Sequence, residues 1–274
     1  MINLRKSQEK LVSVVVTFAT FSVVLTGLGC DRGALDSAPK IDNGDAKMAA
    51  EKIAEAETLY EGREDLNKAR VCVASLRQAR LADYGNYEAA WKLARASFYV
   101  GDRTESNKEK DDMFREGTEA GKAAVKLHPD KPEGHFWLGA NYGGTAANST
   151  IANLSSFQDI KREMEAVLKL DESYEGYSAY LGLGRLYLQA PKVLGGDTEK
   201  AIQYLEKGVK LNPKHGLMHF HLAEAYESAN RDAEAKKQIE ELMAITPDPK
   251  YVAEHKDAVE KGKKLLEKID SDRR

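Results

Sequence analysis

Three histidines near the C-terminal end of the sequence have spacing that could bind a metal: His215, His219 and His221. Imidazoles four residues apart share one face of a helix and can ligate zinc together. His219 and His221, however, are two residues apart and point to different sides of a helix. His219 also stands where similar segments carry large packing residues, Trp91 and Tyr180. We therefore expect no metal site and no cofactor.

The sequence lacks the residue groupings of common enzyme classes. Gly143-Gly144 and Gly195-Gly196 have neither the lysine nor the spacing of a phosphate-binding loop. No Ser/His/Asp, Cys/His or paired-carboxylate arrangement stands out from the charged helix faces. We expect no catalytic residues and predict that the protein is not an enzyme.

Composition excludes two further classes of protein. The 274 residues include 41 Lys+Arg against 44 Asp+Glu, so the chain is not a globally basic nucleic-acid binder. Two cysteines, Cys30 and Cys72, are too few for a disulfide scaffold or a four-thiolate zinc site. Cys72 lies between two valines and is expected to be a small buried packing residue.

The N-terminus has the pattern of an export signal. Arg5, Lys6 and Lys10 precede an uncharged run over residues 11–29. The run ends in small residues before Cys30, which resembles the lipobox of bacterial lipoproteins, although Gly27 stands where leucine is usual. We predict a signal over 1–29, lipidation of Cys30 and a lipid-anchored protein on the periplasmic side of a bacterial cell envelope. A retained transmembrane anchor and a cleaved soluble form are the alternatives.

Residues 30–44 are rich in Gly, Pro, Asp and Ser and predict a flexible tether. From residue 45 onward, apolar residues three and four apart indicate helices. One order of residue types recurs there, and its clearest copy is His219, Leu222, Ala223, Tyr226, Ala235, Ile239, Leu242 and Pro247. This order resembles the tetratricopeptide repeat (TPR) family.

The repeats predict an all-α fold, a TPR-like solenoid of helical hairpins. Earlier copies begin near Ile53, Trp91, His135 and Tyr180, which gives about five repeats over residues 45–249. Residues 250–274 predict a capping helix and tail, because the last repeat of a solenoid must have its apolar face covered. The middle repeats exceed the ordinary length of about 34 residues, and the extra residues fall at 101–112, 143–153 and 188–194. We expect these insertions to form loops on one rim, as a binding or assembly surface; the alternative is that they are solvated loops without a function.

The inner wall of this solenoid carries the candidate groove residues. Phe136, Leu181 and Phe220 follow the large position of successive repeats and form an apolar stripe for a ligand or a partner helix. In the alternative, the cap or a loop covers them and they belong to the core. Arg185 and Glu224 either pair with each other or leave Arg185 to bind a carboxylate.

Three strings narrow the resemblance: HFWLGANYG at 135–143, LGRLYLQAP at 183–191 and GGD at 195–197. Together with the lipobox they resemble the T component of tripartite ATP-independent periplasmic (TRAP) transporters. The resemblance implies a TPR lipoprotein that docks a periplasmic solute-binding receptor and can form a homotrimer with a central apolar pore. By matching position it also implies that Phe136, Trp137, Asn141 and Arg185 belong to the groove wall.

Two hypotheses on function follow. The first is a transport accessory that docks a solute receptor and holds an apolar ligand. The second is a general protein-interaction scaffold in envelope biogenesis without a small-molecule site. The first predicts an open groove lined by Phe136, Leu181 and Phe220, whereas the second predicts that these residues are covered.

Overall fold

The computed structural model describes residues 45–148 and 154–271, which belong to one compact unit of residues 42–274. Within these ranges the chain forms eleven α-helices and two short 3₁₀ helices. The predicted signal, Cys30 and the tether lie outside the described residues. None of the described helices combines the length and hydrophobicity that a membrane span requires.

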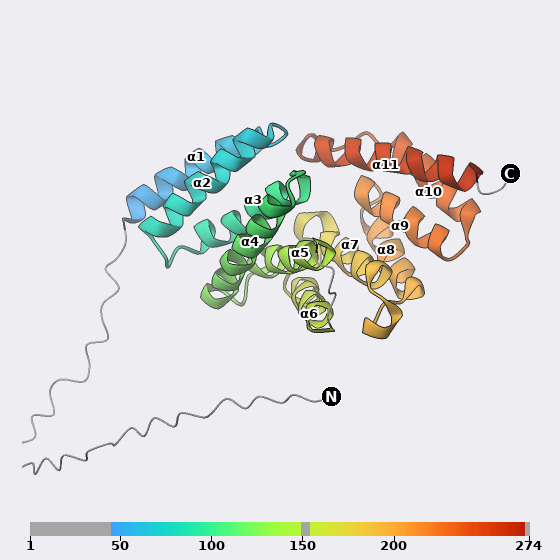
Figure 1. Ribbon diagram of the computed structural model, residues 1–274, viewed down its shortest axis with the longest axis horizontal. Helices are drawn as coiled ribbons and strands as arrows, with labels where there is room; N and C mark the ends of the chain where they lie inside the picture. Colours follow the sequence, from blue (N-terminus) through green and yellow to red (C-terminus); the bar gives the residue numbers. More distant parts are fainter. Residues whose placement is uncertain (1–44, 149–153, 272–274) are drawn as a thin grey trace, which may run out of the picture. The chain divides into compact units, whose positions relative to one another are not determined.

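The helices pair into consecutive antiparallel hairpins (Figure 1). The five pairs are α1 (Ala46–Glu61) with α2 (Leu66–Ala82), α3 (Tyr87–Arg103) with α4 (Asn107–Leu127), α5 (Pro132–Asn148) with α6 (Leu154–Leu170), α7 (Tyr174–Gln189) with α8 (Thr198–Leu211), and α9 (Gly216–Ser228) with α10 (Asp232–Ala244). The 3₁₀ helices η1 (Lys192–Leu194) and η2 (Pro249–Tyr251) and a final helix α11 (Val252–Ser271) complete the unit. The predicted all-α TPR solenoid is confirmed.

Several helices begin at a residue whose side chain caps the free backbone N–H groups of the first turn. The carboxylates of Asp45 and Asp197 accept from the N–H of Met48 and Lys200, at 2.9 and 3.1 Å. Asn86 does the same for the N–H of Ala89 at 2.9 Å. Each such cap is worth about 1 kcal/mol.

The repeat positions form the core between the two helices of each hairpin. In the last repeat Leu222, Ala223, Ala235 and Ile239 are all buried, and the alanines let α9 and α10 approach closely. Cys72 of α2 is a fully buried free thiol, as predicted. Burial raises the pKa of this thiol to about 12, so it is protonated at neutral pH.

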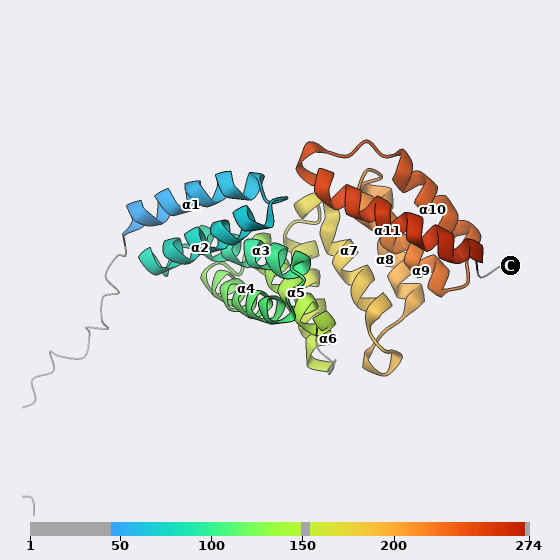
Figure 2. The ribbon, with the colours of Figure 1, turned by 45° about the horizontal axis from the view of Figure 1, so that its top comes forward.

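The capping helix covers the end of the solenoid. α11 packs against α9 and α10 (Figure 2). Ala258 of α11 is buried with Phe220 and Leu242 in one cluster, and Ile269 is buried farther along the helix. The last repeat is therefore shielded from water, as a solenoid requires.

The insertion at 101–112 is mostly helical, so the prediction of a loop there is wrong. α3 continues to Arg103 and α4 begins at Asn107, where Ser106 caps the new helix. The insertion at 188–194 does form a turn, with η1 and the left-handed Gly195. In the third, α5 continues to Asn148, and residues 149–153 lie outside the described ranges.

The first and last elements are joined by ion pairs. Arg63, in the turn between α1 and α2, lies 3.3 Å from Glu254 in the first turn of α11. Arg103, at the end of α3, lies 3.6 Å from Glu254 and 3.8 Å from Asp257. We call these four residues the clasp. It closes one side of the space that the concave faces of the hairpins surround.

Candidate functional site

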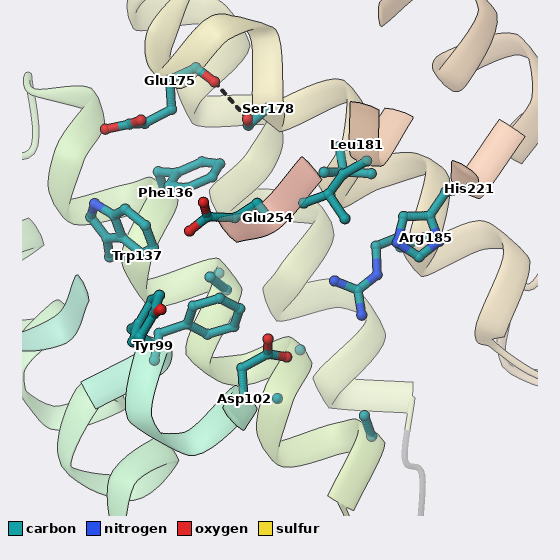
Figure 3. Close-up of a pocket in the computed structure, with 18 of the residues that line it drawn as sticks. Tyr99, Asp102, Phe136, Trp137, Glu175, Ser178, Leu181, Arg185, His221 and Glu254 are labelled. Atoms are coloured by element: carbon teal, nitrogen blue, oxygen red, sulfur yellow. Dashed lines mark hydrogen bonds between the residues drawn. The ribbon is translucent and has the colours of Figure 1, made fainter. Parts of the chain in front are cut away.

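A cavity of about 980 Å³, partly open to solvent, lies on the concave side of the hairpins. Its wall comes mainly from the first helices of successive hairpins and from the start of α11 (Figure 3). Much of the wall is apolar: Phe98, Phe114, Phe136, Trp137, Phe157 and Leu181. This volume falls within the range of roughly 300–1,000 Å³ that is typical of small-molecule pockets.

Trp137 is held in place on this wall by its neighbours. Its indole N–H donates to the Tyr174 hydroxyl at 3.2 Å. Its ring meets Phe136 edge-on, with centroids 4.9 Å apart, and lies 5.9 Å from Phe98. Such edge contacts fix aromatic rings in one orientation, so α3 and α5 present a preformed aromatic surface to the cavity.

Arg185 brings a positive charge to the opposite wall. It lies four residues after Leu181 on α7, so both side chains are on the same helix face. Figure 3 shows its guanidinium directed into the space between the two walls. Its Nε is buried without a hydrogen-bond partner, and Arg185 forms no ion pair within the described part of the chain.

The histidines beside Arg185 are neutral at physiological pH. Nδ1 of His221 lies 2.5 Å from a carboxylate oxygen of Glu224, yet burial lowers the pKa of His221 to about 4. Burial likewise lowers the pKa of His215 to about 4, and its Nε2 contacts the Ser178 hydroxyl at 3.0 Å. The permanent positive charge near His221 therefore comes from Arg185 and, more weakly, from Lys261.

A left-handed backbone segment shapes the rim of the cavity. Glu175, Gly176 and Tyr177 in the first turn of α7 have φ values of 47°, 65° and 69°. Such values are costly for residues other than glycine. Asn212 supports the segment by donating to the carbonyl of Gly176 at 3.1 Å. The segment brings the Glu175 carboxylate to the Tyr251 hydroxyl, at 2.7 Å.

Four of the predicted groove residues line the cavity: Phe136, Trp137, Leu181 and Arg185. The structure places the other three elsewhere. Asn141 is fully buried, and its amide donates to the carbonyls of Ala94 and Trp137 at 3.0 and 2.7 Å. It lies on the side of α5 that faces α3 and α4, so it belongs to the core.

Phe220 and Glu224 also depart from the prediction. Phe220 is 5% exposed and packs with Leu242 and Ala258, because α11 covers the last repeat. Glu224 binds His221 and does not pair with Arg185. The alternative of a covered, core position therefore holds for Phe220, and the predicted pair of Arg185 and Glu224 is absent from the described part of the chain.

The part of the wall that comes from the ends of the solenoid is not apparent from the sequence. Tyr60 and Arg95 belong to the first two hairpins, and Tyr251 and Glu254 to the last segment. No local pattern links residues almost 200 positions apart. The predicted insertions gave a partial signal, because Asp102, Lys110, Gly143, Ala190 and Leu194 from them all line the cavity.

Of the three histidines considered as metal ligands, His219 packs in the core, whereas His215 and His221 line the cavity. His219 is 2% exposed, its Nε2 lies 3.0 Å from the Pro213 carbonyl and its Nδ1 lies 2.9 Å from Gln238. Its ring is thus fully engaged by the core. Over the described ranges, no group of three His, Cys, Asp or Glu side chains is arranged to hold a metal ion.

Comparison with known protein families shows which family the chain belongs to. The model of the family "Regulator of microtubule dynamics protein 1-3" matches residues 52–193, just over half of the sequence. The chain belongs to this family. The match covers α1 to α7, including the four predicted residues that line the cavity. A tetratricopeptide repeat model matches residues 194–254. None of the curated proteins matches the sequence.

Solved structures resemble the chain in fold. TTC0263, a thermophilic TPR protein of Thermus thermophilus, is 19% identical, with a TM-score of 0.57 over 77% of this chain and 98% of that one. MamA of Desulfovibrio magneticus RS-1 is 16% identical, with a TM-score of 0.48 over 70% of this chain and 93% of that one. The likeness to the Thermus protein shows the fold, a TPR solenoid.

Proposed function

We propose that this TPR scaffold is a lipid-anchored accessory protein of the bacterial cell envelope. In this proposal it docks a periplasmic solute-binding receptor, as the T component of a TRAP-type transport system, and holds an apolar ligand in its cavity. The observation that carries the proposal is the cavity of about 980 Å³ with its aromatic wall. The export pattern with Cys30 and the three strings of the TRAP resemblance support the envelope location and the transport role.

Hydrophobic burial supplies the driving force for a ligand. Phe136, Trp137 and Leu181 line a space that is partly open to solvent, although Phe136 and Leu181 are each only 9% exposed and also pack in the core. Covering such surface is favourable by about 25 cal/mol per Å². The rings are already fixed by their mutual contacts, so a ligand loses little free energy to ordering of the wall.

Affinity capture from membranes tests this function. The full-length protein should recover a periplasmic solute-binding receptor, and Phe136→Asp should recover less of it, because a carboxylate on the apolar wall disrupts the ligand-holding surface. Val193→Asp is the matched control, since Val193 is 90% exposed and lies outside the cavity wall. Phe136 also packs in the core, so circular dichroism must first verify that the Phe136→Asp variant folds. Capture without any solute receptor would contradict the transport role.

The TRAP resemblance also supports a homotrimer. The mass of the detergent-solubilised protein, measured by light scattering, should equal three chains. A single chain at micromolar concentration would contradict this part of the proposal, although receptor docking by the monomer would remain testable by capture.

A general interaction scaffold is the second candidate. It is favoured by one observation, namely that Phe220 is covered as this hypothesis predicts. The family's description names regulation of microtubule dynamics, which would be one specific role for such an interaction scaffold. Cosedimentation with polymerised tubulin separates the candidates, because an envelope transport accessory should stay in the supernatant. Saturable cosedimentation would support the second candidate.

A further inference from the structure

The charged side chains of the cavity wall differ in their pairing according to sign. The acidic ones all have partners. Asp102, Glu254 and Asp257 lie within 4 Å of an arginine nitrogen, Glu175 accepts from the Tyr251 hydroxyl, and Asp248 also has a partner. The wall therefore offers no unpaired carboxylate within the described part of the chain.

Several cations of the wall, in contrast, are unpaired. Lys110, Arg185, Lys214 and Lys261 form no ion pair with the described residues. The charge that remains free to act on a ligand is therefore positive. Two of these cations also lie close enough to His221 to lower its pKa by charge repulsion: Arg185 and, more weakly, Lys261. They mark one positive region on the wall.

Arg185 differs from Lys214 and Lys261 because it is partly buried. Lys214 and Lys261 are exposed to solvent, which can hydrate their ammonium groups. Nε of Arg185 is buried without an acceptor, and Nδ1 of His255, elsewhere on the same wall, is also buried without a partner. Buried polar groups are nearly always hydrogen-bonded in native proteins, so this part of the wall is suited to an acceptor that the chain does not provide.

The apolar surface begins next to this charge. Leu181 lies one helical turn before Arg185, and Phe136 and Trp137 face it across the cavity (Figure 3). An occupant that satisfies both features has an anionic head and an apolar tail. Arginine binds a carboxylate with two parallel hydrogen bonds, which gives direction as well as charge.

We propose that the cavity binds a long-chain fatty acid, with its carboxylate on Arg185 and its chain along Phe136, Trp137 and Leu181. This inference rests on the proposed function, of which it names the ligand class. One guanidinium matches one carboxylate, and the cavity volume is of the order that single small molecules occupy. The neutral His215 and His221 leave the recognition of the headgroup to Arg185.

Binding of palmitate and hexadecanol to the purified protein tests the proposal, because the two differ only in the headgroup. Isothermal titration below the critical micelle concentration should show tighter binding of palmitate. Arg185→Gln should weaken palmitate binding about ten- to a hundredfold and leave hexadecanol unchanged, because it removes a charge-assisted hydrogen bond. Arg185→Lys should restore part of the preference.

Arg115→Gln is the matched control, since Arg115 is 70% exposed and pairs with Asp112 outside the cavity. Circular dichroism of each variant verifies the fold. Equal affinity for palmitate and hexadecanol, or an unchanged palmitate affinity of Arg185→Gln, would overturn the carboxylate inference and leave an apolar ligand in place. Failure of both compounds to bind would overturn the apolar-ligand part of the proposed function as well.

Discussion

Two histidines tie the first helices of their hairpins to the preceding turns. Nε2 of His135 lies 3.0 Å from the Pro129 carbonyl, and His219 stands at the equivalent place beside Pro213. Nδ1 of His135 lies 2.6 Å from the Glu163 carboxylate. Because a carbonyl and a carboxylate only accept hydrogen bonds, both ring nitrogens of His135 must donate. The geometry therefore favours the imidazolium form of the ring.

The pair of His135 and Glu163 makes stability depend on pH. The hydrogen bond to Glu163 raises the pKa of His135 above 6.5, despite burial. Burial opposes ionisation of Glu163, but the hydrogen bonds from His135 and Arg162 prevail and lower its pKa below 4.5. The stabilisation by His135 is complete below pH 6.5 and is lost as pH rises through the raised pKa. That by Glu163 is complete above pH 4.5 and is lost as pH falls through the lowered pKa.

We therefore predict that His135→Gln lowers the free energy of unfolding most between pH 4.5 and 6.5, by about 1.5–3 kcal/mol. The difference from the wild type should shrink above this window. Urea denaturation over a pH series measures it. His128→Gln, which removes a more exposed histidine, controls for the loss of an imidazole. A difference that stays constant from pH 5 to pH 9 would show that His135 is not bound as an imidazolium.

The predicted groove residues show which positions the repeat pattern can locate and which it cannot. Repeat position and the family resemblance pointed to Phe136, Trp137, Leu181 and Arg185, which line the cavity because they lie in the middle repeats, where one helix face points to the concave side in each copy. Phe220 has the same repeat position, but it lies in the last repeat, where α11 covers it. The covering helix is not part of the repeat, so its contact could not be predicted from the repeat pattern.

The approach of α4 to α5 depends on a glycine. A Cβ atom on Gly117 of α4 would lie 2.1 Å from Oδ1 of Asn141, which is fully buried in α5. Asn141 cannot move freely, since its amide holds the carbonyls of Ala94 and Trp137. Gly117 and Asn141 thus set the distance between two hairpins and, through Trp137, the position of the aromatic wall.

We predict that Gly117→Ala lowers the free energy of unfolding by about 1–3 kcal/mol, as overpacking of a core does. Gly143→Ala on α5 is the matched control. A Cβ there meets no atom within 4 Å, and alanine in a helix interior gains about 1 kcal/mol over glycine. Thermal denaturation of both variants measures the difference. A Gly117→Ala variant as stable as the wild type would contradict the close contact.

The helices themselves were largely predictable, and the long insertions were not. Apolar spacing and the prolines at the ends of repeats predict a hairpin wherever its two helices pack mainly against each other. At 101–112 the excess length of the repeat suggested a loop. In the structure Ser106 caps a new helix there, and Met113 and Phe114 are buried. These tertiary contacts outweigh the local composition.

The clasp links elements 191 residues apart in the sequence. Side-chain exposure is 13% for Arg63, 22% for Arg103 and 19% for Glu254, so the charges are substantially shielded from solvent. Arg103 also stacks on Tyr99, 3.8 Å from the ring centroid. The clasp is therefore a specific junction, and it lies on the wall of the cavity. Its partners could not be identified from sequence, because no periodicity relates them.

We predict that Glu254→Gln lowers the free energy of unfolding by about 1–2 kcal/mol and speeds hydrogen exchange in the turn between α1 and α2. The loss of the carboxylate leaves Arg63 and Arg103 without their shared partner. Glu119→Gln removes an exposed pair with Lys122 and should cost less than about 0.5 kcal/mol. Unchanged exchange in the turn would mean that the clasp does not hold the two ends together.

The occupancy of the cavity is tested most directly by the fluorescence of Trp137. The chain has two tryptophans, and Trp91 lies outside the cavity wall, so Trp91→Phe leaves the cavity indole as the reporter. Titration with a fatty acid brominated on its chain should quench Trp137 to saturation, because the bromines reach the aromatic wall. The Trp137→Phe variant, which retains Trp91, should show no saturable quenching. Unquenched Trp137, or equal quenching of Trp91, would contradict a ligand in the central cavity.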